Sequence, residues 1–67
     1  MAKIRYTVIY LNSDYDTCIY FGCQCALDVR LFISNAHLFG ADRVFKVLRV
    51  EMSVQNEVFD VTDNFMN

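Results

Sequence analysis

The chain contains no proline and only two glycines, and its charges are few: six lysines and arginines against eight aspartates and glutamates. The scarcity of proline and glycine excludes a low-complexity or disordered chain, because such chains are rich in these residues. The hydrophobic fraction of 55% is instead above the usual range, so we expect the chain to fold. We predict a single domain over residues 1–67, with a core so small that oligomerisation or a bound partner would help to stabilise it.

The net charge and the lack of a long apolar run limit the partners. A formal net charge of -2 lacks the basic excess of a general nucleic-acid binder and is too small to mimic the charge of DNA. No apolar run reaches the roughly 18 residues of a membrane span, and the N-terminus does not resemble a signal peptide. We therefore expect a cytoplasmic protein without a membrane partner, located in the host cytoplasm if a phage encodes it.

The residues that could carry chemistry are few and poorly spaced. Three cysteines, Cys18, Cys23 and Cys25, cannot all be paired, and in a reducing cytosol we expect free thiols. With His37 they could form a zinc set, but Cys23 and Cys25 sit at a strand-to-helix junction instead of on a tight knuckle, and His37 lies roughly three helical turns away. We predict no catalytic residue, no cofactor and no metal site.

Alternation of apolar and polar residues predicts two strands in the first third of the chain. Residues 3–11 alternate and are rich in β-branched and aromatic side chains, and residues 17–23 resume the pattern after a turn at residues 12–16. Gly22 marks a bulge or the end of the second strand. In that strand the alternation predicts three residues on one face: Ile19, Phe21 and Cys23.

Residues 25–40 form the only segment that is long and regular enough for a full helix. Apolar residues recur with the helical period and predict a core-facing stripe of Ala26, Val29, Ile33, Ala36 and Gly40, with Phe32 and Phe39 at its edge. Gly40 suits the end of the helix, because a glycine can adopt the left-handed conformation that closes a last turn. Three leucines lie nearly opposite that stripe: Leu27, Leu31 and Leu38.

The second half of the chain is less decisive. In residues 44–53, basic residues recur every third position as on a helix, but the valines disfavour a helix and we predict a strand. Residues 55–56 can turn the chain into a last strand at 58–61, and a polar tail follows at 62–67, in which Phe65 either packs or frays. The order β-β-α-β-β predicts an α+β two-layer sandwich, with one helix on a four-stranded, mostly antiparallel sheet.

Two features provide more apolar surface than one helix and one sheet need. The three leucines face outward and require a second molecule to cover them, because a soluble monomer seldom leaves such a patch bare. Self-association is the simplest cover. The chain is also rich in tyrosine, and tyrosine clusters occur both at interfaces and in cores. The predicted interface residues are Leu27, Leu31, Leu38, Tyr6, Tyr10 and Tyr20.

The absence of a reactive motif favours a function in binding. We interpret the chain as a non-enzymatic protein that forms a homodimer or docks on a larger host protein, which it inhibits or redirects. Minimal α+β chains are typical of phage and mobile-element accessory proteins that inhibit host enzymes, an argument from size and class alone. The alternative is a nucleic-acid-associated regulator that uses Arg43, Lys46 and Arg49, and a third interpretation is a small enzyme or metal protein centred on the cysteines and His37.

Overall fold

The computed structural model describes residues 3–53 and 55–66. The elements follow one another as β1 (Ile4–Asn12), β2 (Thr17–Cys23), α1 (Ala26–Ser34), the 3₁₀ helix η1 (Ala36–Phe39), β3 (Ala41–Glu51), β4 (Glu57–Asp60) and the 3₁₀ helix η2 (Thr62–Asn64). The strands form one antiparallel sheet in the order β2-β1-β3-β4. This confirms the α+β class and the order β-β-α-β-β, and it resolves the ambiguous segment as a strand.

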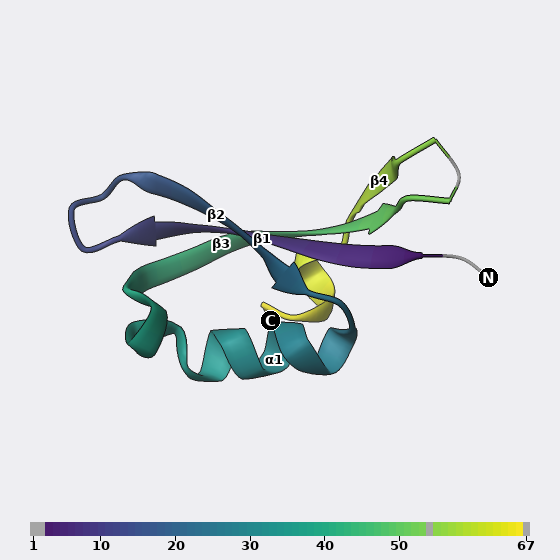
Figure 1. Ribbon diagram of the computed structural model, residues 1–67. Coiled ribbons are helices and arrows are strands. Elements are labelled where there is room, and N and C mark those ends of the chain that lie inside the picture. Colours follow the sequence, from purple (N-terminus) through teal and green to yellow (C-terminus); the bar gives the residue numbers. More distant parts are fainter. Residues whose placement is uncertain (1–2, 54, 67) are drawn as a thin grey trace.

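The helix lies along one face of the sheet, and the C-terminal segment lies on the same side (Figure 1). The two strands that α1 connects, β2 and β3, are both antiparallel to β1, which lies between them. The connection therefore has to cross β1. A helix bridges such a distance while satisfying its own backbone hydrogen bonds, which explains its position under the centre of the sheet.

The turn between β1 and β2 is held by the side chain of Asn12. Its Oδ1 atom accepts hydrogen bonds from the backbone N–H groups of Asp14 (2.9 Å) and Asp16 (3.0 Å). Tyr15 occupies the left-handed region with a φ of 64°. The predicted turn at residues 12–16 is confirmed, and its mechanism is the local side-chain bonding that favours Asn in turns.

A bulge near the end of β2 changes the face on which Cys23 lies. Val8 pairs with Tyr20, but Tyr6 pairs with Cys23, so the register shifts by one residue between them. Cys23 therefore faces the helix and is only 1% exposed. The prediction that it shares a face with its two alternating neighbours was wrong, because alternation ends at a bulge. Those two neighbours lie on the other face and are exposed: Ile19 and Phe21.

The predicted helix at 25–40 is interrupted at Asn35. Its Nδ2 group donates a hydrogen bond to the carbonyl oxygen of Leu31 (3.0 Å), and the chain continues as η1. Gly40 ends η1 with a φ of 75°, the left-handed conformation predicted for it. The predicted single helix is therefore an α-helix followed by a 3₁₀ helix, which has a different period, and Leu38 lies on η1 while Leu27 and Leu31 lie on α1.

The core lies between the sheet and α1 and is built mostly from small and β-branched side chains. Phe32, predicted at the edge of the inner stripe, is 2% exposed and lies at the centre, beside Val29. A phenylalanine at the centre of the core removes more apolar area from water than either alanine of the predicted stripe could remove there. The buried apolar residues are Val8, Cys23, Val29, Phe32, Ala41, Val44 and Val47.

The side chain of Thr62 extends the sheet beyond the end of β4. Its Oγ1 accepts a hydrogen bond from the backbone N–H of Val47 (3.0 Å), and its hydroxyl donates to Oδ1 of Asp60. Asp60 also accepts a hydrogen bond from the backbone N–H of Thr62 (3.0 Å). The bond from the hydroxyl, and after it the bond from the backbone N–H, lower the pKa of Asp60. The chain can then leave the sheet without exposing an unpaired donor on Val47.

The tail after β4 packs under the sheet beside α1. The ring of Phe65 meets Tyr6 edge to face, with ring centroids 5.9 Å apart. The guanidinium carbon of Arg30 on α1 lies 5.3 Å from the centroid of the same phenylalanine. Of the two alternatives for Phe65, packing is therefore the one that occurs, because its ring contacts both Tyr6 of β1 and Arg30 of α1.

Candidate protein-binding surface

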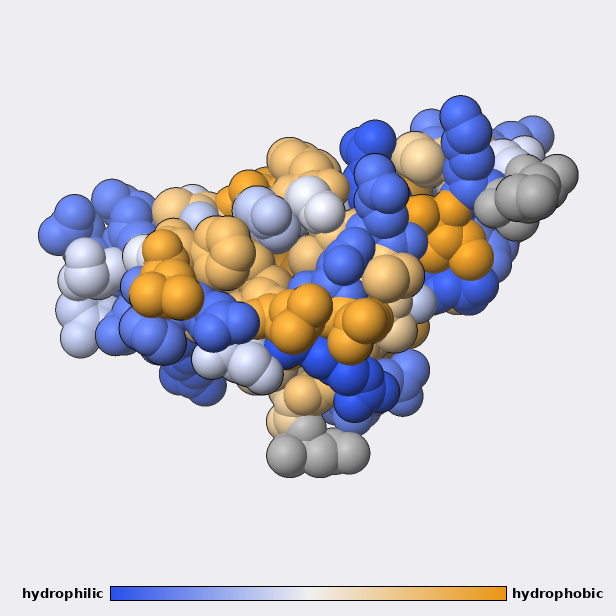
Figure 2. Space-filling model, turned by 60° about the horizontal axis from the view of Figure 1, so that its bottom comes forward, coloured by the Kyte–Doolittle hydropathy of each residue, from blue (hydrophilic) through white to orange (hydrophobic). Residues whose placement is uncertain are grey.

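Three exposed leucines on the helix side form the candidate site, here called the leucine surface. Leu27 and Leu31 of α1 are 62% and 52% exposed, and Leu38 of η1 is 72% exposed. Leu27 and Leu31 are exposed because the sheet packs against the opposite side of α1. Figure 2 shows this side of the molecule, where separate hydrophobic areas alternate with hydrophilic ones. The hydrophobic residues on this side thus form separate areas instead of one continuous stripe.

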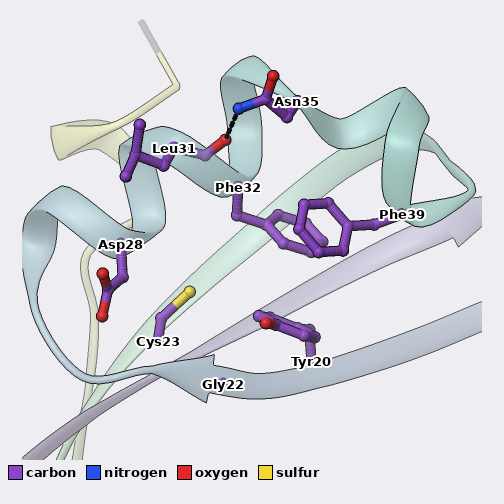
Figure 3. A pocket seen from close by; sticks show the side chains of 8 residues that line it. All are labelled: Tyr20, Gly22, Cys23, Asp28, Leu31, Phe32, Asn35 and Phe39. Carbon is purple, nitrogen blue, oxygen red and sulfur yellow. Dashed lines mark hydrogen bonds between the residues drawn. The ribbon is translucent and has the colours of Figure 1, made fainter.

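A small cavity lies between β2 and α1 and borders the leucine surface at Leu31 (Figure 3). Its volume is about 210 Å³, and Tyr20 and Cys23 line it from β2 while Leu31 and Phe32 line it from α1. Ligand pockets for small molecules have volumes of about 300–1,000 Å³, so this cavity is too small for such a ligand.

Stacked aromatic rings form the wall of this cavity. The ring of Phe32 stacks on Tyr20 at a centroid distance of 4.6 Å and on Phe39 at 4.8 Å. The ring of Tyr20 lies over Gly22, where a Cβ atom would come within 2.9 Å of the ring carbon Cε2 and closer still to the hydroxyl. Gly22 therefore serves two purposes: it lies at the bulge, and its missing side chain leaves room for the tyrosine.

The three tyrosines predicted at an interface pack against the core. Tyr6 contacts Phe65, Tyr10 lies with its ring centroid 5.6 Å from that of Phe32, and Tyr20 stacks on the same phenylalanine. All three are half-buried on the helix side of the sheet. The sequence shows that Tyr6 and Tyr10 share a face, but not that α1 covers this face. Their role at an interface stays a prediction.

The cysteines and the histidine do not converge. Cys18 is half-buried on β2, Cys25 is exposed at the N-cap of α1, and His37 is exposed on η1. Burial raises the pKa of the Cys23 thiol, and Asp28 and then Cys25 raise it further. A raised pKa disfavours the reactive thiolate form. Over residues 3–53 and 55–66, no group of three or more His, Cys, Asp or Glu residues could hold a metal ion.

The three basic residues of the nucleic-acid alternative do not share one surface. Lys46 and Arg49 are three residues apart in a regular part of β3, so they lie on opposite faces of the sheet. Arg49 also forms an ion pair with Glu51, with 3.0 Å between the guanidinium nitrogen and the carboxylate oxygen. Only Arg43 and Lys46 remain for a phosphate contact on one face, which is a small basis for affinity.

A second depression, of about 600 Å³, is lined by Lys3, Ile4 and Arg5 of the N-terminal segment together with Gln24 and Met52. It contains two cationic side chains, but among the described residues no buried side-chain nitrogen or oxygen lacks a hydrogen-bond partner that a ligand could supply. Two exposed cations by themselves do not define an anion site. The leucine surface remains the stronger candidate.

Comparisons with known proteins provide no functional information. No protein-family model, no curated protein and no solved structure matches the chain. None of the described helices is long and apolar enough to cross a membrane. A functional proposal therefore depends on the surfaces of the chain itself.

Proposed function

We propose that this chain is a non-enzymatic protein that works by stoichiometric binding, docking on a larger protein and inhibiting or redirecting it. The observation that carries the proposal is the leucine surface, whose three side chains are each more than half exposed. Burying a fully exposed leucine contributes about 1.5–3 kcal/mol, so covering the more than half of each side chain that is still exposed would give a partner a substantial part of the free energy of a complex.

The small cavity beside Leu31 supports the same proposal. Binding energy concentrates where a side chain of one protein fills a well-packed pocket of the other. The stacked rings of Tyr20, Phe32 and Phe39 provide a pre-formed wall for such a contact, so little order has to be created on binding. The partner would thus contribute an apolar surface with one protruding side chain.

The setting of this function follows the interpretation of the sequence. The docking unit is a two-layer sandwich of helix on sheet in the cytoplasm, and in the host cytoplasm if the protein is a phage or mobile-element accessory protein. Self-association through the leucine surface, the predicted homodimer, would cover the same side chains. A larger partner and a second copy would then compete for them.

Affinity capture with matched variants tests the proposal. We expect tagged wild-type protein to retain a defined partner in stoichiometric amount from host lysate, and the double variant Leu27→Glu/Leu38→Glu to lose it. The control is Val58→Glu, a change on β4 at a side chain that is similarly exposed, at 56%. Equal capture by the leucine variant and the control would contradict the proposal. Capture that disappears after nuclease treatment would favour the nucleic-acid alternative.

A further inference from the structure

The outer edge of β2 is open to pairing. The sheet order β2-β1-β3-β4 places β2 at one edge and β4 at the other (Figure 1), and within the described residues no strand lies beyond either. An edge strand presents a row of backbone N–H and C=O groups that are free to pair with another strand. Proteins that remain monomeric usually protect such edges with charges, proline, or a very short strand.

The two edges differ in this protection. The four-residue strand β4 begins with Glu57 and ends with Asp60, so two copies that paired there would bring four carboxylates together. The seven-residue strand β2 has the sequence Thr-Cys-Ile-Tyr-Phe-Gly-Cys, without a charge or a proline. Its bulge affects only the end near Cys23 and leaves the pairing from Thr17 to Tyr20 regular. Like charges therefore disfavour pairing at β4, whereas at β2 only the bulge near Cys23 interrupts the open edge.

We propose that β2 pairs with β2 of a second copy of this chain, antiparallel about a twofold axis at Tyr20, to form a continuous eight-stranded sheet. Tyr20 is the middle residue of the strand, so this register pairs residues 18–22 of the two copies, whereas Thr17 and Cys23 lie on opposite faces because of the bulge and stay outside the pairing. An axis perpendicular to the sheet also requires that residues opposite each other lie on the same face. With Tyr20 on the axis, Ile19 lies opposite Phe21 of the second copy, and both belong to the face away from the helix.

The side chains on β2 favour a second copy over another partner. Ile19 is 52% exposed and Phe21 is 57% exposed, and neither contributes to the core. In the proposed register Ile19 of each copy lies against Phe21 of the other copy, so this pair of side chains occurs once on each side of the axis. Pairs of an aromatic and a β-branched residue stabilise antiparallel strands. The strand can thus pair with its own copy without placing like charges opposite each other.

This dimer uses the edge of the sheet, whereas the proposed binding to a larger protein uses Leu27 and Leu38 on the helix side, and the two surfaces adjoin at the cavity that Tyr20 and Leu31 line. The dimer also leaves the order of elements within each copy unchanged. Both helices lie on the same side of the extended sheet, because an axis perpendicular to a sheet does not exchange its faces.

Light scattering over a dilution series tests the pairing with the double variant Ile19→Lys/Phe21→Lys. Each substituted side chain would lie opposite a lysine of the second copy, so we expect the dissociation constant of the dimer to rise roughly tenfold or more. The control is Val58→Lys, which places a lysine at a 56% exposed position on the other edge strand. We expect the control to dimerise as the wild type does, and circular dichroism to show that all three chains are folded.

Hydrogen exchange on the wild-type chain provides a second measurement that does not depend on a variant. We expect amides of β2 that are unprotected at low concentration to become protected as the dimer forms, while exchange in β4 stays unchanged. Protection that does not change in β2 while the mass doubles would overturn the proposal, as would a wild-type chain that stays monomeric.

A folded Ile19→Lys/Phe21→Lys variant that dimerises like the wild type would also overturn it. In that case, loss of the dimer in Leu27→Glu/Leu38→Glu would locate self-association at the leucine surface. Failure of the strand pairing would leave capture of a larger partner unaffected, and so the two proposals fail separately.

Discussion

The two sides of α1 carry similar apolar side chains in opposite surroundings. Phe32 is 2% exposed and is stacked between the rings of Tyr20 and Phe39, whereas its neighbour Leu31 is 52% exposed. Hydrophobicity therefore does not distinguish a core residue from a surface residue in this chain. Contact with the sheet does, because only one side of a helix can meet a single layer of strands. Four predictions test how far this difference extends, from the largest expected effect to the smallest.

The largest effect is expected from truncating the inner side chain. Phe32→Ala should lower the free energy of unfolding by about 3–5 kcal/mol, because it removes a buried ring and leaves a cavity among its stacked neighbours. The matched change Leu31→Ala should cost about 0.5 kcal/mol. Urea denaturation of both variants measures the contrast. Equal losses would mean that the leucine belongs to the core.

A smaller loss is expected at the tail that closes the core. Thr62→Val keeps the shape of the side chain but removes the acceptor for the N–H of the fully buried Val47, so unfolding should become easier by about 1–3 kcal/mol. Thr62→Ser retains the hydroxyl and serves as the control. A Thr62→Val variant as stable as Thr62→Ser would show that the hydrogen bond contributes nothing to the fold.

The buried and exposed thiols should respond differently to alkaline pH. Burial raises the pKa of Cys23 above its ordinary value of 9.0, so the folded chain keeps a proton that the unfolded chain loses. The free energy of unfolding is therefore unaffected by Cys23 below the pKa that this thiol has in the unfolded chain. It falls as the pH rises from that value through the higher pKa of Cys23 in the folded chain. Burial followed by the nearby Cys18 raises the pKa of Tyr10 and adds to the loss at higher pH.

Denaturation midpoints measured across this alkaline range should therefore fall less steeply for Cys23→Ala than for wild type. Cys25→Ala changes an exposed thiol and removes only the smallest of the three causes that raise the pKa of Cys23, so it should change the slope less than Cys23→Ala does. If both substitutions leave the slope unchanged, the buried thiol does not contribute to alkaline unfolding.

The smallest effect on stability is expected on the leucine surface. Leu27→Glu/Leu38→Glu should change the free energy of unfolding by no more than about 0.5 kcal/mol per substitution, because both side chains already face solvent. The same variant is expected to lose its partner in affinity capture. A strongly destabilised variant would indicate that these leucines support the fold and not a binding surface.

Several features of the fold could be predicted from the sequence by local rules. Alternation and β-branched residues predicted β1 and β2, the Asn and Asp residues at 12–16 predicted their turn, and Gly40 was expected in the left-handed conformation that it adopts. The spacing of the leucines also predicted their exposure. These features depend on residues within a few positions of one another, which is the range over which propensity and periodicity act.

The remaining features were decided by contacts between distant segments. The bulge that turns Cys23 inward depends on pairing with β1, and the packing of Phe65 depends on its contacts with Tyr6 and Arg30. The cavity beside Leu31 exists only where β2 and α1 meet. Likewise, β2 is an edge strand because β3 pairs with the other side of β1 and not with the free side of β2. A local pattern specifies which residues share a face, but which face is covered depends on the tertiary structure.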